Sequence, residues 1–137
     1  MSRFSRTVRI RSAVKDFTRQ MRDAGIRVSI FLDADVAQVR AARAAEADAI
    51  EINTGRYAEA PADAAGGELA RIAEAASAAG RERLEVLAGH GLNYTNVGAL
   101  NAIPEIVELN IGHSIVARAA LVGMDRAVRD MIALLRR

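Results

Sequence analysis

Apolar residues recur every three or four positions from residue 12 to residue 24, which predicts a helix that stops at Gly25. The pattern then changes to every second position over residues 26–32, as expected for a strand with one buried face. Asp33 and Asp35 follow this strand, and short carboxylates at such a position are expected to cap the next helix. The first part of the chain is therefore predicted to form a helix, a strand and a capped second helix.

The same alternation of helical and strand patterns continues to the end of the chain. Further strands are predicted over residues 49–53, 84–88 and 106–111, and helices over 36–47, 67–79, 96–102, 114–120 and 125–135. A long connection is expected over residues 54–66, and Gly80 is expected to end the helix over 67–79. Four strands separated by helices predict an α/β fold with a parallel sheet and right-handed crossovers.

Polar residues inside the strands favour part of a (β/α)8 barrel over an open sheet. Glu51 and Asn53 alternate with isoleucines in one strand, and Glu108 and Asn110 alternate with apolar residues in another. In an open sheet covered on both faces, a glutamate in mid-strand would be buried without a partner, whereas in a barrel it can face a polar mouth. A full barrel has eight units in about 250 residues, so four units predict half a barrel. We place it over residues 12–137 and leave residues 1–11 unassigned.

Composition restricts the chemistry more than the fold. The chain has 137 residues, of which 51% are hydrophobic, and this is enough for one core. The absence of cysteine excludes a disulfide framework, a zinc–thiolate site and a thiol nucleophile. No stretch approaches the roughly 20 apolar residues that a membrane span needs, and no signal-peptide block is present. We therefore expect a cytoplasmic protein with no membrane partner.

Arginines crowd the first 22 residues, although the formal net charge is only +2. A nucleic-acid-binding arm is one interpretation of such a cluster. The alternative is a helix with a basic, solvated face, which carries no chemistry that reads bases. Because the segment has few aromatic residues and reads as a helix from Arg11 onward, we expect no nucleic-acid partner.

Both histidines of the chain follow a glycine at the end of a predicted strand. His90 lies between Gly89 and Gly91, which allow a backbone to approach a ligand closely, although a loop histidine satisfied by hydrogen bonds is the alternative. Gly112 and His113 precede a helix whose free N–H groups favour an anion, and a simple tight turn is the alternative there. The repeated placement favours function, and barrels commonly bind phosphate in their last units.

Glu51 is a carboxylate within an apolar strand, where its charge is costly unless it meets a cation, a donor or a substrate. It is either a catalytic carboxylate or part of a structural ion pair. Tyr57 and Tyr94 lie in predicted loops, where contact with a ligand and packing of the loop explain them equally well. The sequence contains no phosphate-loop, dinucleotide or metal-ligand motif.

Four strings of the sequence resemble the pyridoxine 5'-phosphate synthase family. They are, in chain order, RVSIFLDAD, AIEINTGRYAEA, LAGHGLNYTNV and IPEIVELNIGHSIVARAALVGM. Their order and spacing are those of the last four strand–helix units, and the resemblance runs from about residue 12 to residue 135. It implies that this chain is the C-terminal half of a (β/α)8-barrel domain.

The resemblance also implies a reaction and a set of site residues. Members of the family condense 3-amino-2-oxopropyl phosphate with 1-deoxy-D-xylulose 5-phosphate, with no metal or other cofactor, to give pyridoxine 5'-phosphate, phosphate and water. By resemblance, His90 is the proton donor and Glu51 stabilises the transition state. Gly91 contacts the aminooxopropyl phosphate, and Gly112 with His113 holds its phosphate group. Because full-length members form octamers, a homo-oligomer is expected.

The chain also departs from the family pattern. Asn53 stands where members commonly carry a histidine in EIHTG, and Leu87 stands where many carry a polar residue. The first four strands of the family barrel, which supply a histidine and a glutamate as proton acceptors, have no counterpart, so we expect a truncated chain with an incomplete site. The functional alternatives are a synthase or its remnant in vitamin B6 biosynthesis, a phosphate-binding or assembly module without turnover, and a purely structural α/β fragment.

Overall fold

A single parallel sheet organises the chain. The structure is a computed structural model that describes the backbone of residues 3–135 and the side chains of residues 12–135. The strands are β1 (Ser29–Asp33), β2 (Ala49–Asn53), β3 (Glu85–Gly89) and β4 (Ile106–Asn110). They are hydrogen-bonded in the order β1-β2-β3-β4, and every neighbouring pair is parallel. The predicted α/β fold with four parallel strands is confirmed, and its sequential strand order is that of half a (β/α)8 barrel.

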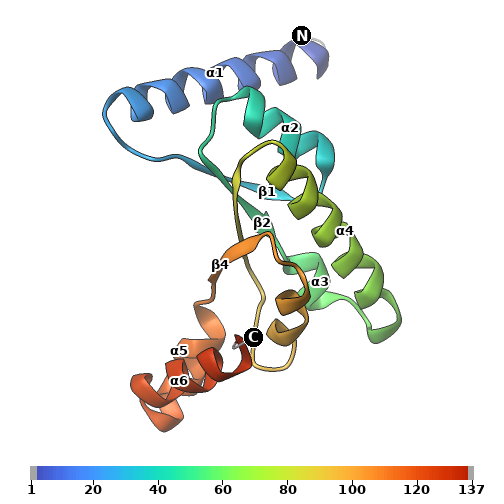
Figure 1. The fold of residues 1–137 in the computed structure, drawn as a ribbon, viewed down its shortest axis with the longest axis vertical. Coiled ribbons are helices and arrows are strands. Elements are labelled where there is room, and N and C mark those ends of the chain that lie inside the picture. The colour runs from blue at the N-terminus through green and yellow to red at the C-terminus, as the bar shows by residue number, and fades with distance from the viewer. Residues whose placement is uncertain (1–2, 136–137) are drawn as a thin grey trace.

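Helices precede, connect and follow the strands, and some of them pack on one face of the sheet. They are α1 (Arg3–Asp23), α2 (Val36–Ala44), α3 (Gly55–Glu59), α4 (Ala62–Arg81), the 3-10 helix η1 (Val97–Ala102), α5 (His113–Val122) and α6 (Met124–Leu135). Figure 1 shows α2 and α4 side by side along the sheet, and the two helices contact each other. The α5–α6 pair follows β4 and contacts η1 and the loop after β3.

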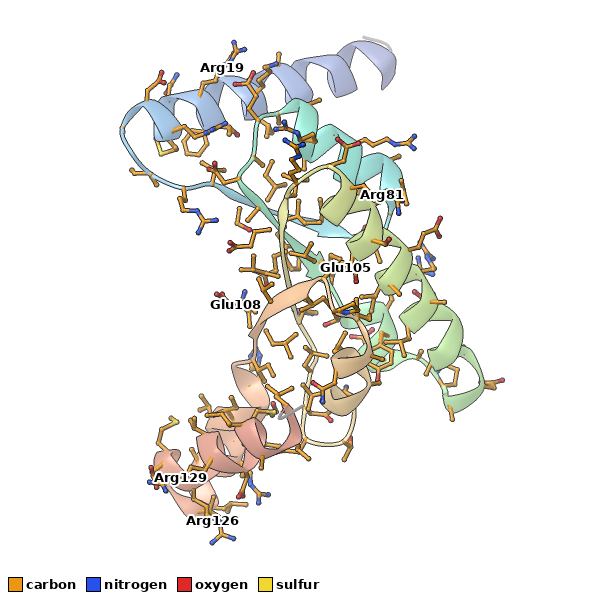
Figure 2. The ribbon with its side chains drawn as sticks, in the orientation of Figure 1. Arg19, Arg81, Glu105, Glu108, Arg126 and Arg129 are labelled. Carbon is orange, nitrogen blue, oxygen red and sulfur yellow. The ribbon has the colours of Figure 1, made fainter. Side chains whose placement is uncertain are left out.

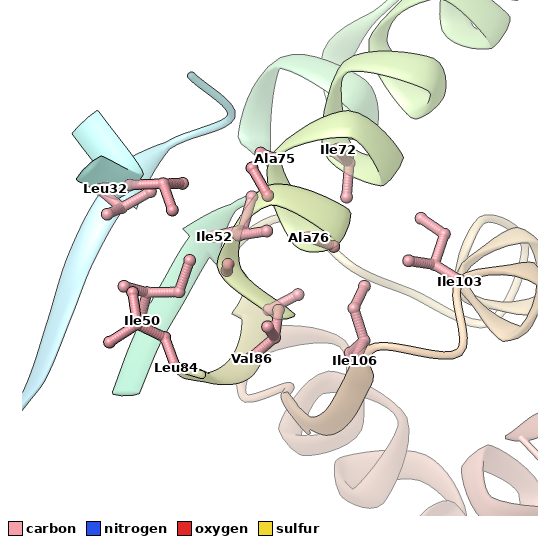
Figure 3. Close-up of a cluster of buried hydrophobic side chains, with 14 of the residues drawn as sticks. Leu32, Ile50, Ile52, Ile72, Ala75, Ala76, Leu84, Val86, Ile103 and Ile106 are labelled. Carbon is pink, nitrogen blue, oxygen red and sulfur yellow. The ribbon is translucent and has the colours of Figure 1, made fainter. Parts of the chain in front are cut away.

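The hydrophobic core lies between the sheet and α4. Ile50 and Ile52 of β2 and Val86 of β3 belong to one hydrophobic cluster with Ile72 of α4, and all four side chains are almost completely buried (Figure 3). The side of α4 that meets them is otherwise rich in alanine, which lets the helix approach the strands closely. Complete burial of one isoleucine contributes about 1.5–3 kcal/mol, so this layer supplies a large part of the stability.

The opposite face of the sheet is open. Phe31, Glu51, Leu87 and Glu108 lie opposite one another across the four strands. Phe31 is 54% exposed, and Glu108 extends from β4 on the side away from α4 (Figure 2). An irregularity in the pairing of β3 with β4 leaves Val107 without a partner in the register, and its side chain is 67% exposed. The open face is therefore mixed in polarity rather than uniformly polar.

The first helix is longer than the sequence pattern predicts. It begins at Arg3, so most of the unassigned segment 1–11 is helical, whereas residues 1 and 2 lie outside the described part. The apolar stripe that predicted this helix is not covered, because Val14 is 38% exposed and Phe17 is 57% exposed. The strand that follows is also shorter than predicted and begins at Ser29 instead of residue 26.

The long connection expected over residues 54–66 is largely helical. It contains α3 and the first turn of α4, and α4 runs past Gly80, which was expected to end it. The alanine-rich sequence explains both differences, since alanine has the highest helix propensity and each interior glycine costs only about 1 kcal/mol. The chain instead leaves α4 at Arg83, whose positive φ of 58° reverses its direction.

The carboxylates after β1 have two different roles. Asp35 caps α2 as predicted, because its carboxylate accepts a hydrogen bond from the N–H of Ala37 at 2.7 Å. Asp33 was expected to act in the same way but accepts instead from the side-chain amide of Asn53 at 3.2 Å. This contact ties the carboxyl ends of β1 and β2 together.

Glu46 connects α1 to the sheet. Its carboxylate lies 2.8 Å from the guanidinium of Arg19 and 3.0 Å from the ammonium of Lys15, and its backbone carbonyl accepts from Arg22 at 2.9 Å. The hydrogen bond from Arg19, followed by that from Lys15, lowers the pKa of Glu46 to about 2 from an ordinary value of 4.5. Two of the basic residues that suggested a nucleic-acid arm, Arg19 and Arg22, are thus used in contacts within the chain.

We predict that replacing Glu46 removes an acid-sensitive part of the stability. Since the folded pKa is about 2 and the ordinary value is 4.5, the stabilisation is complete above pH 4.5 and is lost as the pH falls toward 2. The difference in unfolding free energy between the wild type and Glu46→Gln should therefore shrink over that interval in urea denaturation. At pH 7 it should also shrink in about 1 M salt, because the pairs are partly exposed. A difference independent of pH would contradict this account.

Candidate functional site

All five residues predicted for the site line one cavity. Its volume is about 520 Å³, and it lies at the carboxyl ends of β2, β3 and β4. The predicted residues that line it are Glu51, His90, Gly91, Gly112 and His113. Phe31 forms part of the wall from the open face of the sheet, and Asn110 contributes from the end of β4. The chain thus brings the two glycine–histidine pairs and the strand carboxylate into one space.

The loop that carries His90 has an unusual backbone. His90 and Gly91 follow β3 directly and have positive φ values of 83° and 76°. A residue other than glycine rarely adopts such a backbone conformation, and strained residues of this kind concentrate at functional sites. A Cβ atom on Gly91 would lie 2.6 Å from Cβ of Ala58 in α3, so this position requires glycine both for its backbone angle and for space.

The rest of the loop is held by asparagines. The side-chain oxygen of Asn93 accepts from the N–H of Thr95 at 2.8 Å and from its hydroxyl at 2.7 Å. The side chain of Asn96 also contacts the loop: its oxygen accepts from the N–H of Asn93, and its amide group donates to the carbonyl of Gly91 at 3.2 Å. These contacts fix the backbone that follows His90 independently of any ligand.

Glu51 approaches the end of β3. Its side chain is half-buried on the open face, and a Cβ on Gly89 would lie 2.7 Å from its Oε1 atom. Within the described residues, its carboxylate has no hydrogen bond or ion pair, so the structural ion pair considered as an alternative is not present there. The carboxylate is therefore available to a bound molecule, next to the loop that carries His90.

The start of α5 lines the cavity through Gly112, His113 and Ser114. The helix begins at His113, and Gly112 before it provides no side-chain cap, while the first N–H groups of a helix have no partner within it. Such a helix start favours an anion. The hydroxyl of Ser114 donates to the carbonyl of Leu92 at 2.8 Å and links this helix to the loop of His90.

The α5–α6 pair is held together by one guanidinium. Arg118 of α5 pairs with the carboxylate of Asp130 in α6 and lies over the ring of Tyr94, 4.9 Å from its centroid. The hydrogen bond from Arg118 lowers the pKa of Asp130. Tyr94 in turn donates to the backbone carbonyl of Ala127 at 2.8 Å. These contacts fix the direction of α5 and therefore of its N–H groups.

Neither tyrosine lines the cavity. Tyr57 is buried and donates to the carbonyl of Asn96 at 2.8 Å, and Tyr94 is engaged with α6. Packing of the loops, one of the two interpretations of these residues, is therefore what the structure shows.

Sequence reasoning missed the residues that support the histidine. Thr54 and Gly55 lie at the start of α3, and Thr54 hydrogen-bonds to the backbone of the His90 loop. Gly55 lies against the imidazole, since a Cβ there would be 2.8 Å from Cδ2 of His90. Both lie in the segment that was predicted only as a long connection. The only available signal was their position directly after a strand, at the end where a barrel places its site.

A second, mainly apolar cavity of about 760 Å³ lies between α1, β1 and α2. It contains none of the predicted site residues and is lined largely by alanines of α2 and by apolar side chains of β1. Its position follows from the fact that β1 is an edge strand, and we place the candidate site in the smaller polar cavity. Within residues 12–135, no three histidine, aspartate or glutamate side chains gather as metal ligands. No helix of the described part is both long and apolar enough to cross a membrane.

The sheet and its cavity together define a parallel α/β chain of half-barrel type with a candidate site at the carboxyl ends of its strands. Residues 6–137 match the family described as pyridoxal phosphate biosynthesis protein PdxJ, and the chain belongs to this family. The match begins within the segment that was left unassigned.

Two relatives illustrate the relationship. The chain is 54% identical over 121 residues to a protein of Trichlorobacter lovleyi named pyridoxine 5'-phosphate synthase. The aligned region covers 88% of this chain and 51% of the relative. It is 52% identical over 119 residues to a protein of the same name from Idiomarina loihiensis. This aligned region covers 86% of this chain and 49% of the relative. The chain therefore spans about half the length of the curated relatives that it matches.

We predict that Gly91→Ala lowers the unfolding free energy by about 1–3 kcal/mol, because the new Cβ meets Ala58 and the backbone angle becomes strained. Urea denaturation measures this loss. In the double variant with Ala58→Gly, the clash is removed while the strained angle remains, so the two substitutions should couple favourably. Strictly additive losses would show that the loop does not pack on α3 as described.

Proposed function

We propose that this chain forms one side of the active site of a pyridoxine 5'-phosphate synthase. The reaction would be the condensation of 3-amino-2-oxopropyl phosphate with 1-deoxy-D-xylulose 5-phosphate, with loss of water and phosphate. The observation that carries the proposal is the convergence of His90, Glu51 and the Gly112–His113 turn on one cavity. Membership of the family and the names of the relatives support the same assignment.

The start of α5 is proposed to hold the phosphate of 3-amino-2-oxopropyl phosphate, with Gly91 in contact with the same substrate. Gly112 supports this role because the protein itself does not require glycine there. A Cβ on Gly112 would have no heavy atom within 4 Å, and its φ is an ordinary −108°. The open space and the uncapped N–H groups suit a phosphate group.

His90 is proposed to donate a proton during the condensation, and Glu51 to stabilise the transition state. An imidazole exchanges protons near neutral pH, which suits general acid catalysis. A carboxylate that faces a cavity without a protein partner can stabilise positive charge that develops on a substrate. The loss of water in the reaction requires a proton at the departing oxygen, which His90 would supply from the cavity wall.

The open face of the sheet supports an incomplete site and an oligomer. The outer edges of β1 and β4 are unpaired within the described chain, and unpaired strand edges are templates for further strands. We propose that these edges pair with further strands, either from a second copy in a homo-oligomer or from the remaining units of a longer barrel. Those strands would add the proton acceptors of the family. Without them, the chain would bind phosphate compounds without turnover, which is the second candidate function.

We predict that purified chain, alone, binds 3-amino-2-oxopropyl phosphate and forms little pyridoxine 5'-phosphate from the two substrates. Product formation is measured with the wild type and with His90→Ala, and light scattering on the same samples reports the oligomeric state. Product that disappears in the variant would show that the chain assembles a working site. Neither product nor binding, from folded protein, would contradict the proposed function.

We predict that Gly112→Ala weakens binding of 3-amino-2-oxopropyl phosphate by about tenfold, or 1.4 kcal/mol, because the methyl group enters the ligand space. Isothermal titration calorimetry measures the affinity. Gly98→Ala is a matched control, since this glycine also has no neighbour within 4 Å of its Cβ position but does not line the cavity. Both variants should keep their stability within about 0.5 kcal/mol. Equal affinities in the two variants would exclude Gly112 from the phosphate site.

A further inference from the structure

The hydroxyl of Thr54 has one proton, which two backbone carbonyls at and just after the end of β3 share, and the backbone N–H of Thr54 donates separately to one of them. Its side chain is completely buried, and its hydroxyl lies 2.8 Å from the carbonyl oxygen of Gly89 and 2.6 Å from that of His90. Its backbone N–H also donates to the carbonyl of Gly89 at 2.8 Å. One residue of the β2–α3 turn therefore binds the two peptide groups on either side of the His90 α-carbon.

These contacts account for the unusual backbone conformation of His90. In an extended strand, successive carbonyl groups point in opposite directions, so two neighbouring carbonyls cannot both reach one hydroxyl. The carbonyls of Gly89 and His90 do so, and the φ of 83° at His90 shows the turn that makes it possible. The buried hydroxyl of Thr54 therefore stabilises a backbone conformation that a histidine does not adopt by preference.

The same turn also provides the surface on which the imidazole lies. A Cβ on Gly55 would be 2.8 Å from Cδ2 and 3.6 Å from Nε2 of His90, so the ring packs against the α-carbon of Gly55. The carbonyl oxygen of the Asn53 side chain accepts from the N–H of Gly55 at 2.9 Å and fixes this residue in turn. The β2–α3 turn thus contacts both the backbone and the ring of His90.

We propose that Thr54 is a positioning residue for His90, because its hydroxyl holds the Gly89–His90 carbonyls in the turned conformation that lays the imidazole on Gly55 at the cavity wall. Thr54 itself does not line the cavity and takes no part in proton transfer. The functional consequence rests on the proposed role of His90 as proton donor, whereas the geometric claim does not.

The test compares Thr54→Val, which keeps the shape and loses the hydroxyl, with Thr54→Ser, which keeps the hydroxyl. Thr18→Val is the matched control, because Thr18 is also buried and donates to a backbone carbonyl, that of Val14, within α1. The geometric readout is the nuclear Overhauser contact between the Hδ2 proton of His90 and the α-protons of Gly55, with the histidine resonances assigned through His90→Asn.

We expect the contact in the wild type, in Thr54→Ser and in Thr18→Val, and its loss in Thr54→Val. In the assembled enzyme, where the first four units are supplied, Thr54→Val should lower kcat by about 100-fold, the loss expected when a reacting group moves by about 1 Å, with KM little changed. A contact that persists in Thr54→Val, or fails to return in Thr54→Ser, would overturn the proposal. Loss of the contact with unchanged turnover would instead remove His90 from catalysis and leave the positioning in place.

Gly55→Ala keeps the test decisive if Thr54→Val does not fold. This variant retains the hydrogen bonds of Thr54 but places a methyl group where the ring lies. Displacement of the His90 resonances, with the backbone resonances of residues 89 and 90 unchanged, is expected. Unchanged ring resonances would show that the imidazole does not rest on this turn, and the proposal would fail.

Discussion

The burial of Ile50 and Ile52 against α4 is the constraint on which the rest of the structure depends. Because side chains alternate along a strand, fixing these two residues in the core directs Glu51 to the opposite face. The parallel register then brings Leu87 and Glu108 to the same face and aligns the carboxyl ends of the strands. The candidate site follows from this alignment, since His90 comes directly after β3 and His113 begins the helix that follows β4.

The sequence was sufficient for the order of elements and for choosing, near strand ends, residues that line one cavity. Strong alternation in β2 and the glycines beside His90 and His113 are local signals that survive without tertiary information. The limits of the helices were less predictable. In α4, alanine propensity outweighed the expected effect of Gly80, and in α1 the apolar stripe carrying Phe17 predicted a helix but not what would cover it.

The residues that position His90 and Glu51 were unpredictable for a different reason. Thr54 is distant from His90 in the sequence, and its importance depends on where two turns meet in space. The same holds for Ala58, whose Cβ makes glycine necessary at position 91, and for Gly89, which makes room for the carboxylate of Glu51. These are tertiary relationships that no periodic pattern records. They also show that the shape of the cavity depends mainly on hydrogen bonds to backbone carbonyls and on glycines, which leave space for their neighbours, rather than on charged groups.

The sequential order of the sheet also bears on how the chain folds. Each strand pairs only with strands that come next to it along the chain, so no ladder requires the two ends of the polypeptide to meet. Each pairing still joins residues that are 20 to 36 positions apart, because parallel strands need a crossover connection between them. A chain of this kind can gain its sheet one βα unit at a time and can be extended at either edge without rearranging strands already formed.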